Sequence, residues 1–173
     1  MMVRIAGCIF ITGATTLGGI QRAKRLRDQY REMQYLYKII CSIQSEIRYA
    51  RAYLSEIFTE TGQKLKNPYK DWLVQLGRWM EEEHREMFDE MWKKSIGKYL
   101  SESLLPKKEL EKLEVLGGQL GIADMEIQIR FLDLYLEQMD QTMKEMQDEM
   151  KTRIRLNHCL GVMSGILISV LLL

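Results

Sequence analysis

The sequence predicts an all-α protein: an antiparallel helical bundle with two long helices, flanked by N- and C-terminal transmembrane helices. Three observations predict this fold. The 173 residues are 46% hydrophobic and include only 2 prolines, a composition typical of helical proteins. Apolar residues recur at gaps of three and four over two long stretches, which is the helical period. Residues 5–20 and 156–173 carry no charged side chain, as is typical of membrane spans.

The N-terminal stretch, residues 5–20, contains no charged residue, so we expect residues 1–20 to form a transmembrane helix. Its length is marginal, because a span needs about 17 to 20 apolar residues. A basic cluster at residues 22–27 follows, and such clusters stay on the cytoplasmic side. A secretory signal peptide is the alternative, although its positive charge would precede the apolar core, where only Arg4 stands.

The first long seam of apolar residues predicts a helix that ends near Thr61 and Gly62. Glu46 and Tyr49 flank this seam and are candidates for a partner interface or a structural motif. The structural alternative is that Glu46 pairs with a neighbouring arginine and that Tyr49 covers the edge of the bundle. The seam consists of Leu36, Ile40, Ile43, Ile47, Ala50, Leu54 and Ile57.

Two shorter helices are expected in the middle of the chain. Pro68 opens the first, whose inner face includes Trp72 and Leu76. The second carries Trp92 on its inner face and ends before Pro106. With the long arms, we expect about five helices, or six if the first long helix is interrupted.

A glycine turn joins a helix opened by Pro106 to the second long helix. Gly117 and Gly118 lie inside the helical pattern, where each costs about 1 kcal/mol relative to alanine, so a close helix approach is expected there. Gly121 is expected to close the helix in a left-handed conformation, and Asp124 to cap the next one. With Gln128 these residues form a candidate structural motif or partner interface: Gly117, Gly121, Asp124 and Gln128.

The second long helix carries a seam that matches the first and leads into the C-terminal stretch. Residues 156–173 contain no Asp, Glu, Lys or Arg, and basic residues at 151, 153 and 155 precede them. We therefore expect a cytoplasmic body over residues 21–155 and a second transmembrane helix over 156–173. A buried core helix, or a C-terminal tail anchor alone, is the alternative. The seam consists of Met125, Ile129, Leu132, Leu136, Met139, Met143, Met146 and Met150.

Both predicted spans carry small residues at a spacing of four, which lets membrane helices approach closely. The residues are Ala14 and Gly18 in the first stretch, and Gly161 and Gly165 in the second. Either the two spans pair with each other, or each pairs with a span of a partner.

The sequence offers little chemistry. With 25 Lys and Arg against 24 Asp and Glu, the near-neutral charge argues against a nucleic-acid interface. Glu81 and His84 have the Glu-x-x-His spacing of di-iron bundles, but a second such motif is absent. The three cysteines fit no zinc pattern. We therefore predict no catalytic residue, no cofactor and no metal, and a protein that is not an enzyme.

Several segments together resemble the stage III sporulation protein AB family over nearly the whole chain. At the N-terminal end these are Ala14-Thr15-Thr16 with Gly19, Ala23-Lys24 with Leu26, and Glu46-Ile47-Arg48-Tyr49. They continue with Leu116-Gly117, Leu120-Gly121, Asp124 and Gln128, and then with Leu160-Gly161, Gly165 and Leu171-Leu172. Two positions depart from the family pattern. Tyr53 stands where the family tends to have proline, so the first helix is expected to run on, and Met87-Phe88 replaces an Ala-Trp pair.

The resemblance implies a helical bundle similar to the cytoplasmic domain of type II secretion platform proteins. It also implies a non-enzymatic membrane platform or adaptor in the channel-like complex between mother cell and forespore. Its partners would be a secretion-type sporulation ATPase and other membrane components of that complex, with the body in the mother-cell cytoplasm. The alternative function is a membrane-anchored helical sensor or signal relay. Whether the chain forms a homo-oligomer is left open.

Overall fold

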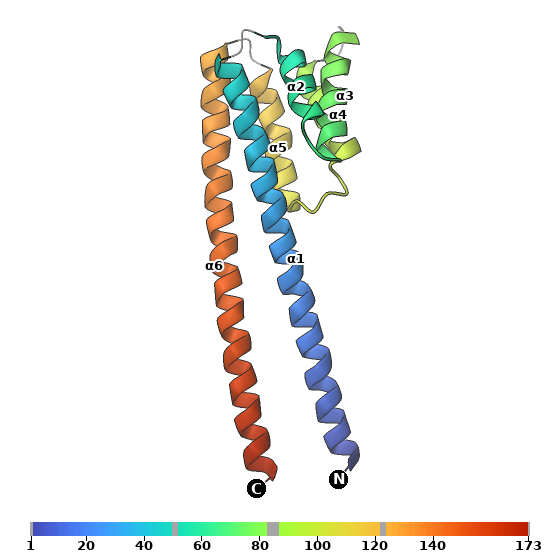
Figure 1. The fold of residues 1–173 in the computed structure, drawn as a ribbon, viewed down its shortest axis with the longest axis vertical. Coiled ribbons are helices and arrows are strands. Elements are labelled where there is room, and N and C mark those ends of the chain that lie inside the picture. The colour runs from blue at the N-terminus through green and yellow to red at the C-terminus, as the bar shows by residue number, and fades with distance from the viewer. Residues whose placement is uncertain (1, 50–51, 83–86, 122–123, 173) are drawn as a thin grey trace. The chain divides into compact units, whose positions relative to one another are not determined.

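The structure, a computed structural model, is an all-helical bundle across the residues it describes (Figure 1). It describes the backbone of residues 2–49, 52–82, 87–121 and 124–172, and within these ranges the side chains of residues 21, 24–49, 52–82, 87–121 and 124–152. The two long helices, α1 and α6, have 48 residues each. The helices are α1 (Met2–Tyr49), α2 (Leu54–Gln63), α3 (Tyr69–Glu82), α4 (Phe88–Tyr99), α5 (Lys107–Leu120) and α6 (Met125–Leu172).

The chain forms two compact units. The body comprises residues 32–141, and the other unit comprises residues 1–31 with 142–173. In the second unit the amide of Gln147 donates a hydrogen bond of 2.8 Å to the Tyr30 hydroxyl. Helices α1 and α6 continue without interruption past residues 20 and 155, where the sequence suggests boundaries.

The terminal stretches were predicted to be transmembrane helices. No helix among the described residues combines the length and the apolar character that crossing a membrane requires. The predicted membrane-packing residues lie outside the residues whose side chains are described: Ala14, Gly18, Gly161 and Gly165.

An aromatic cluster fills the body between α2, α3 and α4. The rings of Trp72 and Trp92 are fully buried and lie 5.2 Å apart between centroids, and Phe58 lies 5.8 Å from Trp92. Each indole has a hydrogen-bond acceptor: Trp72 donates to the Ser95 hydroxyl at 2.9 Å, and Trp92 donates to the Leu113 carbonyl at 2.7 Å. The polar atoms of the cluster are therefore satisfied inside the apolar core.

The first long helix is interrupted, which bears out the six-helix alternative rather than the expectation that this helix runs on. Helix α1 ends at Tyr49, and Tyr53 takes extended backbone angles of φ −69° and ψ 151° before α2 begins. The Glu56 carboxylate accepts a hydrogen bond of 3.4 Å from the Tyr53 N–H, which helps to cap α2. The seam misled the prediction because Ile57 is buried in α2 as Ile47 is in α1, and periodicity reports burial rather than backbone continuity.

The two long helices are joined within the body by polar contacts. The Gln44 amide donates to the Ile129 carbonyl at 3.3 Å and to the Asp133 carboxylate at 2.7 Å. Arg48 lies 3.8 Å from the same carboxylate. Beneath these contacts, both seams contribute to the core through the buried residues Leu36, Ile40, Ile43, Ile47, Leu132, Leu136 and Met139.

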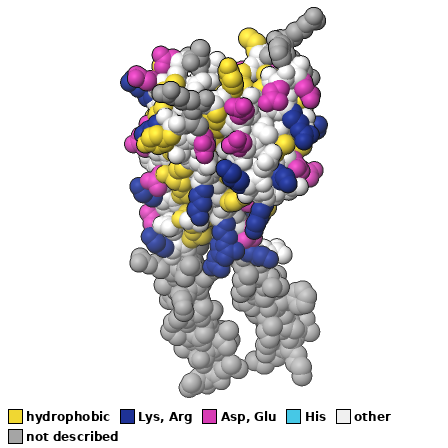
Figure 2. All heavy atoms as spheres, turned by 45° about the horizontal axis from the view of Figure 1, so that its top comes forward, with side chains coloured by type: hydrophobic (Ala, Val, Ile, Leu, Met, Phe, Trp, Pro, Cys, Tyr) yellow, Lys and Arg dark blue, Asp and Glu magenta, His cyan; other side chains and the backbone are white. Residues whose placement is uncertain are grey.

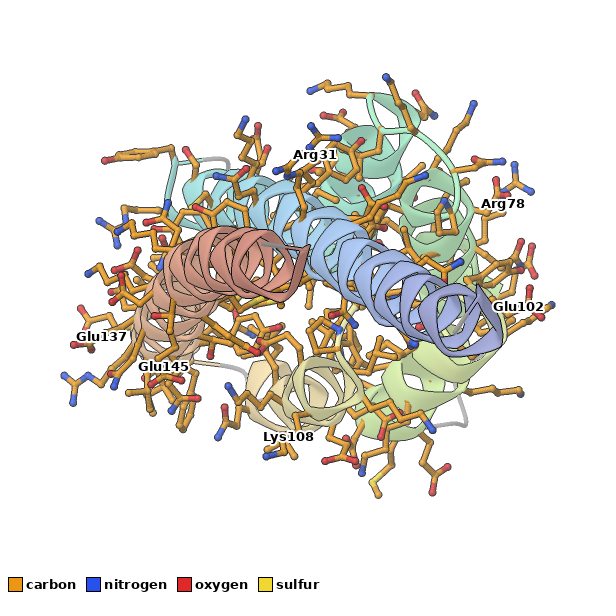
Figure 3. The ribbon with its side chains drawn as sticks, turned by 90° about the horizontal axis from the view of Figure 1, so that it is seen from below. Arg31, Arg78, Glu102, Lys108, Glu137 and Glu145 are labelled. Atoms are coloured by element: carbon orange, nitrogen blue, oxygen red, sulfur yellow. The ribbon has the colours of Figure 1, made fainter. Side chains whose placement is uncertain are left out.

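Most of the described charged side chains lie on the outside, and Glu109, which is 1% exposed, is buried. Figure 2 shows acidic and basic side chains interspersed on the visible face, with apolar side chains between them. In the view of Figure 3, Arg78, Glu102, Lys108 and Glu137 project away from the helices. A mixed surface of this kind gives no large field of one sign, which agrees with the near-neutral net charge.

Candidate partner interface

The close helix approach expected at the glycine pair is found at one of the two glycines. A Cβ atom added to Gly117 would lie 2.2 Å from Cδ1 of Trp92, so α5 can pack on that indole only with glycine at this position. At Gly118 the nearest atom to such a Cβ is an Asp89 carboxylate oxygen at 3.4 Å, which is ordinary contact. Gly117 therefore fixes α5 against α4, and Gly118 does not.

Gly121 does not adopt the left-handed conformation that was predicted for it. Its backbone angles are φ −67° and ψ −5°, and its N–H still donates to the Gly117 carbonyl at 3.1 Å, as in a continuing helix. No described glycine has a positive φ. Gly121 keeps the backbone angles and the hydrogen bond of a helical residue, so α5 ends without a left-handed cap. A Cβ at this glycine would lie 3.4 Å from Phe88.

Asp124 and Gln128 hold the start of α6. The Asp124 carboxylate accepts hydrogen bonds from the N–H groups of Glu126 at 2.9 Å and Ile127 at 3.3 Å, which confirms the predicted cap. The Gln128 amide donates to the Leu120 carbonyl at 2.7 Å. This bond ties the last turn of α5 to the first turn of α6, so the reversal of the chain is fixed on both sides.

Tyr49 lies beside this reversal. It is 79% exposed, and it lines a surface pocket of about 380 Å³ together with Gln128 and Met125. Ala52 and Leu54, on either side of Tyr53, line the same pocket, and Tyr53 is 82% exposed. We call this region, formed by Tyr49, Tyr53, Met125 and the pocket beside them, the tip surface.

Glu46 lies on α1 one turn before the tip surface. Its side chain is partly exposed, and among the described residues it makes no salt bridge, so the arginine pairing considered for it is not found there. Of the predicted residues, the structure thus brings Tyr49 and Gln128 to one pocket. Asp124 adjoins Met125, which lines that pocket, whereas Gly117 acts in the packing of α4 against α5.

Tyr53 and Met125 were not singled out from the sequence. Tyr53 had been noted only as a departure from a proline, and Met125 only as the first residue of a seam. The proline that the family tends to have at this position could have indicated the break at Tyr53. The φ of Tyr53 is −69°, which is the angle that proline imposes. Nothing in the sequence indicated that Met125 is exposed, since an exposed seam residue at a helix end has the same spacing as a buried one.

Two tyrosines in the body face carboxylates. The Tyr69 hydroxyl donates to Glu32 at 3.0 Å, and burial together with the Glu32 charge raises the pKa of Tyr69 above its usual range. Burial and the nearby Glu109 raise the pKa of Tyr135 well above its usual range. Glu109 is 1% exposed and forms a 3.2 Å salt bridge to Lys112. The Tyr135 hydroxyl lies near Glu109 without a well-aligned hydrogen bond.

The described residues form no candidate metal site. They contain no group of three or more His, Cys, Asp or Glu side chains that could hold a metal ion. His84, considered above with Glu81, lies outside the described residues. The described residues place two exposed tyrosines beside the capped start of α6, an arrangement that suits contact with another protein.

Nearly the whole chain is similar to known sporulation proteins. Residues 4–173 match the protein family described as stage III sporulation protein AB. The stage III sporulation protein AB of Bacillus subtilis (strain 168) is 24% identical over 172 residues, which cover 99% of this chain and 100% of that protein. A solved structure of stage III sporulation protein AB matches with a TM-score of 0.64 at 20% identity, covering 72% of this chain and 97% of that chain.

Proposed function

The chain belongs to the stage III sporulation protein AB family, and on this basis we propose that it is a non-enzymatic membrane adaptor that docks a secretion-type ATPase. Membership confirms the resemblance found in the sequence and carries a role in sporulation. The ATPase as partner, the membrane location and the absence of enzyme activity belong to the proposal. They rest on the resemblance to secretion platform proteins and on the features that follow.

The tip surface is the observation that carries the docking proposal. Tyr49 and Tyr53 expose about four-fifths of their side chains beside a pocket, although tyrosine is usually at least half buried. Exposed tyrosines on a rigid support are typical of protein interfaces, because they bury a large area at a small entropy cost. Beside the tyrosines, the Asp124 cap and the Gln128 bond to Leu120 hold the start of α6, which contributes Met125 and Gln128 to the pocket.

We propose that the two uncharged terminal stretches hold the chain in the mother-cell membrane, with the body in the cytoplasm. The support comes from the sequence: residues 5–20 and 156–173 lack charged side chains, and basic residues flank both on the side of the body. Labelling of single cysteines placed in the body, in intact and in permeabilised cells, tests this topology. Labelling of the body in intact cells would contradict it.

The decisive experiment measures binding of the ATPase to the full chain reconstituted in lipid nanodiscs. The sporulation ATPase of the same organism is titrated into the nanodiscs with and without nucleotide. Saturable binding is expected, and it should weaken about tenfold or more in the Tyr49→Ala/Tyr53→Ala variant, since two candidate hot-spot residues are lost. The matched control is Met87→Ala/Leu104→Ala, which removes exposed apolar side chains elsewhere on the body.

Two results would overturn the docking proposal. One is the absence of binding by a chain whose thermal unfolding is cooperative. The other is equal binding by the tyrosine variant and by the control variant, which would remove the tip surface from the interface. A separate control tests which protein hydrolyses ATP. An inactivating substitution in the ATPase should abolish all ATP hydrolysis by the mixture, since the adaptor is proposed to have no such activity.

A further inference from the structure

The segment of α1 that follows the uncharged N-terminal stretch is strongly basic. Residues 21–31 contain five Lys and Arg residues and one acidic residue, Asp28. The side chains of Lys24, Arg25 and Arg27 are exposed, and none of the three forms a salt bridge with a described residue. The Asp28 carboxylate lies 4.0 Å from Arg31, so the one acidic residue is engaged with a different cation. We call Lys24, Arg25 and Arg27 the basic segment of α1.

The end of α6 in the same unit carries much less net charge. Residues 144–155 contain four basic and three acidic residues, which leaves a net charge of +1, whereas residues 21–31 have a net charge of +4. Lys151 forms a salt bridge of 3.1 Å with Asp148. The charge of α6 is therefore largely balanced by its own acidic residues, and the unbalanced charge lies mainly on α1.

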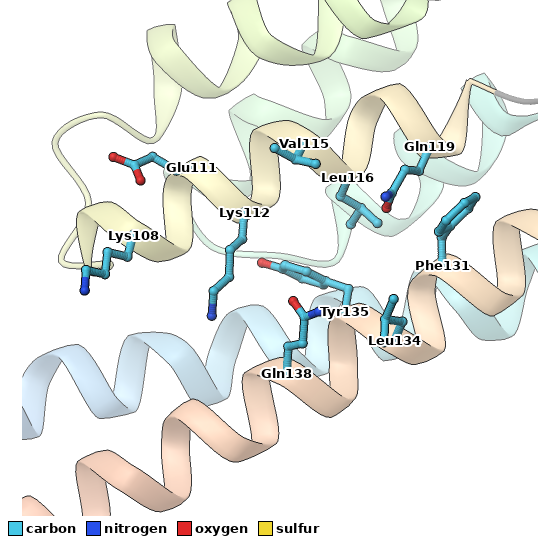
Figure 4. A pocket seen from close by; sticks show the side chains of 10 residues that line it. All are labelled: Lys108, Glu111, Lys112, Val115, Leu116, Gln119, Phe131, Leu134, Tyr135 and Gln138. Carbon is cyan, nitrogen blue, oxygen red and sulfur yellow. The ribbon is translucent and has the colours of Figure 1, made fainter.

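The cations beside the groove between α5 and α6 are also accompanied by carboxylates. This groove has a volume of about 460 Å³ and lies between helices that run in opposite directions (Figure 4). Its lysines, Lys108 and Lys112, share α5 with Glu111, and Lys112 forms a salt bridge of 3.2 Å with the buried Glu109. The exposed apolar residues of its walls are Val115 and Leu134. Mixed charges of this kind attract an anionic surface weakly, so the groove provides a control for the basic segment.

The basic segment lies directly beyond the uncharged stretch of residues 5–20, and α1 runs through both without a break. At 1.5 Å per residue, Lys24 and Arg27 follow residue 20 by about 6 Å and about 10 Å along the helix. The polar headgroup layer on each side of a bilayer is about 5 to 8 Å deep. If residues 5–20 span the bilayer, the three cations therefore lie at the level of the lipid phosphates.

We propose that the basic segment of α1 binds the headgroups of anionic lipids. The proposal rests on the membrane location proposed above and adds a lipid class to it. Lys and Arg side chains close to a bilayer attract anionic lipids, because the opposite charges lie within the screening length of about 8 Å. Arg25 and Arg27 also present guanidinium groups, which can donate two parallel hydrogen bonds to one phosphate. Anionic lipids then gather around α1 more than around α6.

The distribution of the three cations around the helix favours a lipid surface over an acidic protein partner. With about 100° between successive residues, positions 24, 25 and 27 spread over about 160° of the circumference of α1. A helix that enters a bilayer meets headgroups on every exposed side. A protein that docks against one helix contacts a narrower stripe, so it would leave part of the basic segment unused.

Electron spin resonance of the full chain in phosphatidylcholine vesicles tests the lipid preference. Trace amounts of spin-labelled phosphatidylglycerol or spin-labelled phosphatidylcholine report how much of each lipid the protein immobilises. Phosphatidylglycerol should be preferred about fivefold at low salt, and high salt should reduce this preference because it screens the charges. The variant Lys24→Gln/Arg25→Gln/Arg27→Gln should lose most of the preference.

The matched control is Lys70→Gln/Arg78→Gln/Lys108→Gln, which removes the same charge from exposed positions of the body, one of them at the α5–α6 groove. It should keep the wild-type preference, and both variants should unfold at the wild-type temperature, since the substituted side chains are exposed. An equal loss of preference in the two variants would overturn the proposal, because net charge alone would then explain it.

Two further outcomes separate this proposal from the membrane location on which it rests. If the wild-type chain immobilises both labelled lipids equally, the chain lies in the bilayer, but the basic segment does not select anionic lipids and is left for an acidic protein. If it immobilises neither lipid, the proposed membrane location fails, and the lipid proposal fails with it. Docking of the ATPase at the tip surface is measured separately and does not depend on either result.

Discussion

The interior of the body and its tip surface use aromatic residues in opposite ways. Trp72, Trp92 and Tyr69 are essentially inaccessible, and the polar atom of each ring makes a hydrogen bond. Tyr49 and Tyr53 expose about four-fifths of their surface. The interior rings stabilise the fold by burial, whereas the exposed rings contribute little to it. The contrast indicates that the tip tyrosines can be changed without loss of the fold, which makes them suitable probes of binding.

The largest effect is expected where α5 packs on the interior ring. Gly117→Ala should lower the free energy of unfolding by about 2 to 3 kcal/mol, because the added methyl group overlaps Trp92. Chemical denaturation of the full chain measures it. Gly118→Ala is the neighbouring control and should be neutral or stabilising by up to about 1 kcal/mol, since helix propensity improves. Equal effects of the two substitutions would show that the close contact does not limit the packing.

Alkaline pH should reveal the contribution of the buried Tyr135 to stability. The folded state raises the pKa of Tyr135, so the neutral phenol contributes stability below the unfolded pKa of about 10, and this stability is lost as pH rises above it. Tyr135→Phe should reduce the fall in unfolding free energy above pH 10, by at most about 1.4 kcal/mol per pH unit. Identical slopes in the wild-type protein and the Tyr135→Phe variant would contradict the role of burial.

Removal of the Asp124 cap beside the tip surface should have an intermediate effect on stability. Asp124→Ala removes the acceptor for two N–H groups and should cost about 1 kcal/mol of stability, whereas Asp124→Asn should retain most of it. Thermal unfolding of the two variants provides the comparison. If alanine and asparagine were equally tolerated, the carboxylate would not be needed to hold the start of α6.

The smallest effect is expected at the break between α1 and α2. Tyr53→Pro should change stability by less than about 1 kcal/mol, because the backbone already has the φ of proline and the gain in chain stiffness offsets the lost hydrogen bond to Glu56. The same change at Arg48, inside α1, should cost about 3 kcal/mol or more. A large loss at Tyr53 would indicate that its N–H bond matters more than its backbone angle.

The sequence predicted the parts of the fold and of the interface that depend on local chemistry. Asp124 could be assigned as a cap because its side chain acts on N–H groups two and three residues away. The close contact at Gly117 was expected because a helical glycine is costly, although its partner Trp92 could not be named. The prediction of a left-handed conformation at Gly121 was wrong, since glycine permits that conformation without requiring it.

The remaining features depend on which surfaces stay uncovered, and periodicity does not report that. Leu134 lies off the apolar seam of α6, and neither Leu134 nor Val115 was singled out from the sequence. Their common groove arises only from the antiparallel pairing of α5 and α6. Tyr53 was hidden for a similar reason, because the seam continues from α1 into α2 across the break.

The edge-to-face indoles of the interior also give the protein a built-in optical reporter. All three tryptophans lie on α3 and α4, and Trp72 and Trp92 are close enough for their excited states to couple. The tip surface and the α5–α6 groove contain none. The tryptophan emission of this chain should therefore remain constant when a partner docks rigidly at the tip surface. A change in this emission would mean that docking is transmitted to the helices that carry the tryptophans.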